Sequence, residues 1–179
     1  GEGKGRFYLD RIDVADAAAP RLLDPVNVPG WLLSYEDADG SPALATLEPT
    51  RLSRTVASVD ACREALGPGA FFDADRRACL RIDYAVHAVS LDGALARIDA
   101  SFMLPAGTSP LGVAAEGSVL TLTFVPAEDV NSSNARRFPV LIGRDLGSPD
   151  PSFEIVDAGE IDPRSVRVVH GLVIVSTLA

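Results

Sequence analysis

The sequence predicts an all-β protein, built as a sandwich or a closed barrel of short, mostly antiparallel strands. Three observations lead to this class. Apolar and polar residues alternate with period two over several runs, which is the pattern of strands with one buried face. Turn signals rich in glycine and proline separate these runs. Only one segment, near residues 58–66, has the features of a helix.

The clearest alternation predicts a β-hairpin over residues 80–104. Its apolar positions are Leu80, Ile82, Tyr84, Val86 and Ala88 in the first run, and Ile98, Ala100, Phe102 and Leu104 in the second. A three-residue loop over residues 91–93 sets Val86 against Ile98 and keeps the apolar faces together. A two-residue loop at Asp92 and Gly93 would set Val86 against Asp99 instead. We therefore expect the three-residue loop.

Before the hairpin, strand-like runs and connections alternate. We expect a first strand over residues 6–14 and an irregular connection over residues 16–29. A second strand is expected over residues 31–36, and one or two more over residues 43–56. Pro20, Pro25 and Pro29 make regular structure unexpected in the connection, because proline lacks a backbone N–H. Residues 1–29 are therefore expected to form an N-terminal strand and extended connection, attached to a single β domain over residues 30–179.

The expected helix has recognisable ends. Ser58 can cap its N-terminus, and Asp60 lies in the first turn, where the helix dipole favours negative charge. Gly67 and Pro68 end the helical pattern.

After the hairpin, we expect a loop over residues 105–117, because it contains Gly107, Pro110 and Gly112. Further strands are expected over residues 118–125, 140–142 and 153–156. The last run, residues 165–178, is apolar at both odd and even positions. We therefore expect one strand that is buried on both faces, or that pairs with another subunit.

The composition limits the kinds of partner that we expect the protein to bind. The net charge of -9 argues against nucleic acid, since phosphate binding needs a basic surface. No apolar run reaches the length of about 20 residues that a membrane-spanning helix needs, so no membrane span is expected. No glycine-rich phosphate loop is present either, and no cofactor is expected.

Two cysteines, Cys62 and Cys79, leave two alternatives open. A disulfide between them would stabilise the fold by about 3 kcal/mol and would place the protein in an oxidising, extracytoplasmic compartment. Two buried thiols would instead pack as small apolar side chains.

The histidines and acidic turns give weak signals. His87 is expected on the wetter face of the hairpin, opposite Arg97, as a surface or edge histidine. His170 is expected in the core, and the two histidines lack the spacing of a zinc site. Asp37 and Asp39 resemble the start of a calcium loop, but the later ligands are missing, so they are only weak calcium candidates.

One segment resembles a known family. Residues 138–146 read Phe-Pro-Val-Leu-Ile-Gly-Arg-Asp-Leu, which resembles the Leu-Ile-Gly-Arg strand near the end of retropepsin-like aspartic peptidases. The bacterial branch known as "ATP-dependent zinc proteases" is the most similar. Its flanking segments are matched in order by residues 120–123, 131–134 and 153–157. Gly30 and Trp31 match the strand with which that family opens.

The resemblance implies an acid-base mechanism that this chain lacks in part. In retropepsins each subunit of a dimer contributes one aspartate from an Asp-Thr-Gly motif, and the two carboxylates share one proton. This chain has Glu48, Pro49 and Thr50 at the corresponding place, without the Asp-Thr-Gly motif. Glu48 is thus the catalytic candidate that the resemblance supplies.

Two hypotheses for function follow. The first is a non-catalytic structural, assembly or binding module that works as a subunit of a larger complex, with protein partners or self-association. The alternative is a retropepsin-like domain, either degenerate or active through Glu48 in a dimer.

Overall fold

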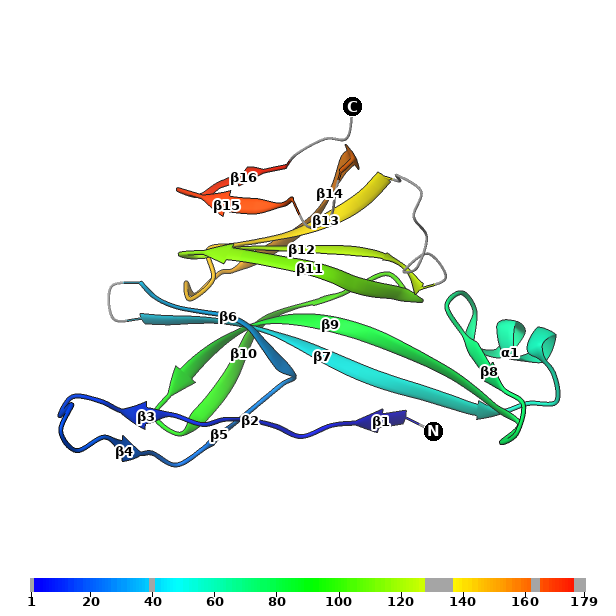
Figure 1. The fold of residues 1–179 in the computed structure, drawn as a ribbon, viewed down its shortest axis with the longest axis horizontal. Coiled ribbons are helices and arrows are strands. Elements are labelled where there is room, and N and C mark those ends of the chain that lie inside the picture. The colour runs from blue at the N-terminus through cyan, green and yellow to red at the C-terminus, as the bar shows by residue number, and fades with distance from the viewer. Residues whose placement is uncertain (1, 39–40, 128–136, 162–164, 176–179) are drawn as a thin grey trace.

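The computed structural model describes residues 2–38, 41–127, 137–161 and 165–175. It is mostly β with one short helix, which confirms the predicted class. The described residues form no closed barrel, so a sandwich-like arrangement is the architecture that fits. Figure 1 shows its layers, with a C-terminal hairpin above a four-stranded sheet, a six-stranded sheet below that, and an N-terminal arm beneath.

The six-stranded sheet is built on two long antiparallel strands, β7 and β9, which pair from Leu44 opposite Val89 to Thr55 opposite Ala78. Shorter strands continue the sheet on either side of this ribbon: β1 and β6 pair with β7, and β8 and β10 pair with β9. Their bounds are β1 Glu2–Lys4, β6 Trp31–Ala38, β7 Ser41–Thr55, β8 Phe71–Asp73, β9 Ala78–Asp92 and β10 Leu95–Met103. The region for which one or two strands were expected, residues 43–56, therefore holds a single strand.

The four-stranded sheet is an antiparallel meander. Its strands are β11 Thr108–Glu116, β12 Val119–Pro126, β13 Arg137–Arg144 and β14 Ser152–Glu160. The prediction of a loop over residues 105–117 is wrong, because β11 occupies most of this segment. Pro110 is tolerated there since β11 is an edge strand, and the register shifts between Pro110 and Gly112.

The two sheets enclose the main core. Ala45, Leu47, Val86 and Ala88 of the six-stranded sheet pack with Leu120, Leu122, Phe124 and Leu141 of the four-stranded sheet. These side chains are fully or almost fully buried, which places most of the hydrophobic stabilisation between the sheets.

The C-terminal run forms a hairpin on the far face of the four-stranded sheet. Its strands are β15 Arg167–Val169 and β16 Leu172–Ile174, and the turn lies at His170 and Gly171, with φ of 49° and 73°. The single buried strand expected over residues 165–178 is therefore wrong for the described residues. Two positive φ angles in succession are what a tight hairpin turn requires. A second core, with Val140, Ile142, Ile161 and Val166, joins this hairpin to the sheet.

The N-terminal arm, residues 7–28, is a folded-back ribbon of four short strands. They pair as β2 Phe7–Leu9 with β5 Val26–Val28, and β3 Ile12–Asp13 with β4 Arg21–Leu22. The irregular connection expected over residues 16–29 thus holds two strands, and the first strand expected over 6–14 is divided into β2 and β3. Val26 and Val28 are buried, and β5 contacts β10.

The long hairpin exists, but its predicted register is wrong. The turn lies at Gly93 and Ala94, and Asp99 is an extra residue in β10, so Val86 lies opposite Phe102 rather than Ile98. Gly93 has a φ of 59°, which a two-residue turn at residues 93 and 94 requires. Both predicted loops, over residues 91–93 and 92–93, end one residue earlier. The apolar faces still meet. The partner of Val86 changes from Ile98 to Phe102, and because alternate residues of a strand share a face, a shift by an even number of residues keeps the same face.

A helical knob, residues 59–73, caps the far end of the β7–β9 ribbon (Figure 1). Its helix α1, Val59–Leu66, confirms the prediction: the Ser58 side chain accepts a hydrogen bond from the Ala61 N–H, and Gly67 ends the helix. Cys62 and Leu66 pack against Cys79 of β9 in a small third core.

Candidate functional site

Three polar side chains form a row across the outer face of the six-stranded sheet. Glu48 comes from β7, His87 from β9 and Ser101 from β10. Ser101 is the register partner of His87, and Thr46, two residues before Glu48, is the partner of His87 on the other side. Because alternate residues of a strand share a face, the pairing brings all three side chains to one face.

Each member of the row contacts the next through the imidazole of His87. Ser101 Oγ lies 2.8 Å from His87 Nδ1, and His87 Nε2 lies 3.2 Å from Glu48 Oε2. A carboxylate only accepts hydrogen bonds, so a hydrogen bond between Nε2 and Glu48 requires the proton to be on Nε2. In a neutral imidazole, Nδ1 then has a lone pair and accepts the Ser101 hydroxyl proton.

Burial differs along the row. The side chains of His87 and Glu48 are only 6% and 17% exposed, whereas Ser101 is an exposed residue. Backbone directly after the N-terminal arm lies over this part of the sheet, since the Thr46 hydroxyl beside His87 donates a hydrogen bond of 2.5 Å to the carbonyl of Pro29. One end of the row is thus an exposed serine residue, while the imidazole and carboxylate are shielded.

The structure corrects both histidine predictions. His87 is buried and lies opposite Ser101, not on a wet face opposite Arg97, because the real register differs from the predicted one. His170 is exposed in the last hairpin turn rather than in the core, and its backbone N–H donates to Glu116 Oε2 at 2.8 Å. Ser101 was not singled out from the sequence, since only the correct register places a serine beside His87.

Cys62 and Cys79 form a disulfide that joins α1 to β9. Of the two alternatives that the sequence left open, the structure therefore shows the bridge. The neighbouring Arg81 guanidinium contacts the carbonyl of Leu66 at the end of α1 and pairs with Asp83 at 2.8 Å. The knob is thus fixed to the β7–β9 ribbon by a covalent bond and by the contacts of Arg81, whose ion pair with Asp83 is largely buried.

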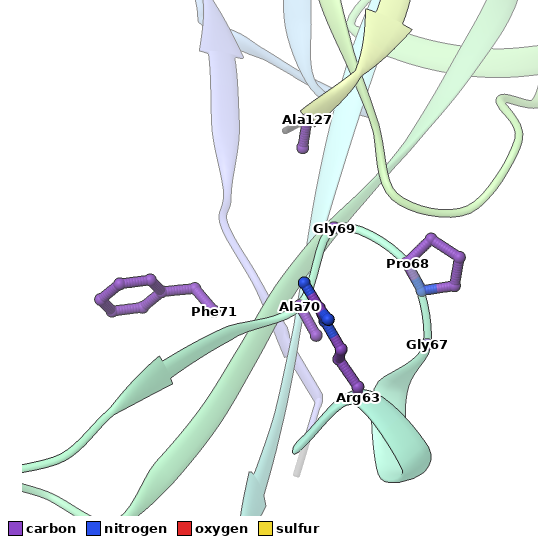
Figure 2. A pocket seen from close by; sticks show the side chains of 7 residues that line it. All are labelled: Arg63, Gly67, Pro68, Gly69, Ala70, Phe71 and Ala127. Atoms are coloured by element: carbon purple, nitrogen blue, oxygen red, sulfur yellow. The ribbon is translucent and has the colours of Figure 1, made fainter. Parts of the chain in front are cut away.

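A cavity of about 750 Å³ lies where the knob meets the four-stranded sheet. Figure 2 shows the loop of residues 67–70 along its wall, with Arg63 and Phe71 beside it and Ala127 beyond. Among the described residues that line it, Arg63 alone carries a charged side chain, and Gly67, Pro68 and Gly69 are three of the others. None of the members of the polar row lines this cavity.

The calcium candidates cannot be placed in a site. Asp39 lies outside the described residues, and only the backbone of Asp37 is described. Among the described residues, no group of three or more His, Cys, Asp or Glu side chains is arranged to hold a metal ion. Within the same part of the chain, no helix has the length and apolar character needed to cross a membrane.

Fold and site together define an all-β, sandwich-like protein with a short polar row on its outer face. Comparisons with protein families, curated proteins and solved structures gave no match. The resemblance to retropepsin-like peptidases therefore stays a prediction. Of the segments that carry it, residues 131–134 lie outside the described residues. Residues 120–123, 138–146 and 153–157 lie in, or run just past, the neighbouring strands β12, β13 and β14, and Trp31 begins β6. Glu48 lies in the middle of β7, opposite Ala85.

Proposed function

We propose that the protein is a β-rich assembly module that self-associates as a subunit of a larger complex. The observation that carries the proposal is the N-terminal arm, which exposes large apolar side chains. Tyr8, Ile12, Val14 and Leu22 are 57%, 63%, 65% and 69% exposed. Contiguous exposed apolar surface is typical of protein–protein contacts.

The arm is too small to bury these side chains within itself. It is a two-stranded ribbon with short ladders, and such ribbons are marginally stable alone. Its anchor to the body includes Arg11, whose guanidinium donates to the carbonyl of Gly93 at 2.7 Å and also bonds, within the arm, to the carbonyl of Asp24 at 3.1 Å. Contact with another subunit would bury the apolar tip and would stabilise the arm.

The body continues the apolar surface beside the arm. A cavity of about 490 Å³ lies between arm residues 9–12 and the side chains of Leu32, Tyr35 and Leu91. Leu32 and Tyr35 are themselves about half exposed, at 45% and 50%. The arm and the start of β6 therefore offer one connected surface for a partner.

The disulfide supports a location for this function. Bridged cysteines persist in oxidising compartments, so we place the assembly outside the cytoplasm.

The test is the native mass of the full chain over a wide concentration range, by light scattering or native mass spectrometry. We expect a species larger than the monomer, and we expect the double variant Ile12→Ser/Leu22→Ser to dissociate it. Phe71→Ser is the matched control, since Phe71 is 66% exposed on the distant knob. A chain that stays monomeric at every concentration, or a control that dissociates equally, contradicts the proposal.

The second candidate is a retropepsin-like domain, degenerate or active through Glu48 in a symmetric dimer. What favours it is that the resembling segments in β12, β13 and β14 lie side by side in one sheet. Incubation with peptide and poly-glutamate substrates, comparing the parent with Glu48→Ala, tests the active version. Cleavage that is unchanged in Glu48→Ala would end it.

A further inference from the structure

We propose that Ser101 is a base-activated nucleophile that accepts acyl groups from small activated esters. His87 is the general base, and Glu48 is the positioning residue that sets the tautomer of His87. The proposal rests on the polar row and is independent of the N-terminal arm surface. A nucleophile within hydrogen-bond reach of a base that a third group orients is the usual sign of an activated hydroxyl.

The distances fit this assignment. Ser101 Oγ is 2.8 Å from His87 Nδ1, within the range for proton transfer to a general base. The 3.2 Å contact between His87 Nε2 and Glu48 Oε2 favours the Nε2–H tautomer. The opposite tautomer would aim an imidazole lone pair at a carboxylate, which is electrostatically unfavourable.

The strand pairing holds the geometry in place. Ser101 and His87 are direct partners across β9 and β10, and β7 fixes Glu48 from the other side of β9. His87 is therefore held between two neighbouring strands, which limits the rotation of its ring. A preorganised base costs little reorganisation when the hydroxyl reacts.

Exposure determines the class of substrate. Ser101 is reachable from solvent, and none of the cavities described above surrounds it. An open site provides little binding energy for a long substrate, so we expect reaction with small esters that have good leaving groups.

The chemical step is a simple acyl transfer. A bond forms between Ser101 Oγ and the carbonyl carbon, and the bond from that carbon to the leaving oxygen breaks. The hydroxyl proton moves to His87 Nδ1 and then to the leaving oxygen. Glu48 accepts the hydrogen bond from Nε2 throughout, and it stabilises the imidazolium that forms.

The first experiment incubates the full chain with 4-nitrophenyl acetate and locates the acetyl group by intact mass and peptide mapping. We expect acetylation at Ser101 that is faster than at Lys4, an internal reference amine. Ser101→Ala removes the fast label, and His87→Asn slows it by about 100-fold or more, the scale of general-base catalysis. Ser90→Ala is the matched control and leaves the rate unchanged, because Ser90 donates to the Asp99 carboxylate at 3.2 Å rather than to an imidazole.

A second measurement separates activation from a purely structural role and does not require His87 to be replaced. Nitrogen-15 NMR of the imidazole is expected to show protonated Nε2 and unprotonated Nδ1 in the parent protein. Glu48→Gln is expected to mix the tautomers and to slow acetylation, with circular dichroism confirming that the variant is folded. A parent protein with protonated Nδ1, or an acetylation rate at Ser101 no faster than at Lys4, overturns the proposal.

Discussion

Gly69 and Gly107 meet backbone to backbone, where the helical knob touches the connection between the two sheets. A Cβ built on Gly69 would lie 2.6 Å from the Cα of Gly107, which is closer than real contacts allow. Both residues also have positive φ, at 70° and 71°. This contact leaves no room for any side chain, so the knob docks on the sandwich only because both positions are glycine.

Gly69→Ala should therefore destabilise the protein. Strain at a positive φ alone costs on the order of 1–3 kcal/mol, and the collision with Gly107 adds to it. Urea denaturation monitored by circular dichroism measures the change. Gly117→Ala is the control, since Gly117 has a φ of 56° but nothing within 4 Å of its added Cβ. Equal losses of stability in the two variants would show that the close approach does not matter.

Loss of the disulfide should loosen the knob. The bridge spans a sequence separation of 17 residues, and replacing both cysteines by serine should lower the free energy of unfolding by about 3 kcal/mol. Intact mass should rise by two hydrogens when the parent protein is reduced. Reductant should lower the denaturation midpoint of the parent and leave that of the double variant unchanged. If reductant affects both proteins alike, its effect does not come from the disulfide.

The hydroxyl of Thr46 should help hold the N-terminal arm on the outer face. Thr46→Val removes its hydrogen bond to Pro29 and leaves a carbonyl without that donor, which costs on the order of 1 kcal/mol. We expect faster amide hydrogen exchange in β2 and β5, read by mass spectrometry. Thr121→Val is a matched control, because Thr121 is equally buried but donates to Ala114 in the other sheet. Unchanged exchange in the arm of Thr46→Val would contradict this role.

Tyr84 should make stability fall at alkaline pH. Burial raises the pKa of its phenol above the ordinary value of 10.0, because desolvation disfavours the phenolate. The unfolded chain then ionises this tyrosine first, so its stabilising effect is complete below about pH 10 and is lost as pH rises through the folded pKa. Denaturation midpoints between neutral and alkaline pH should fall less steeply in Tyr84→Phe. If the midpoints of the parent and of Tyr84→Phe fall equally steeply with pH, Tyr84 does not contribute to the alkaline loss of stability.

Signals contained within a few residues were enough to predict part of the fold. The helix was predicted correctly because Ser58, Asp60 and Gly67 act locally, on the turn of which they are part. Alternation also gave the right buried face for Val86 and Ala88. Strand content and class follow from such local patterns, which do not depend on distant residues.

Features that depend on distant pairing were missed. The extra residue at Asp99 shifts the hairpin register, and nothing in the run itself distinguishes it from its neighbours. Since the predicted register put His87 opposite Arg97, the contact with Ser101 was not expected. Glu48 was chosen for its place in a resemblance, and its contact with His87 arises from the pairing of β7 with β9.

The N-terminal arm is synthesised before the strand against which it packs, since β5 contacts β10, which follows it in the chain. Val26 and Val28 of β5 are buried in the finished molecule, and β10 is one of the strands that β5 contacts there. The arm therefore cannot complete its docking on the sheet until synthesis has passed residue 103, the end of β10.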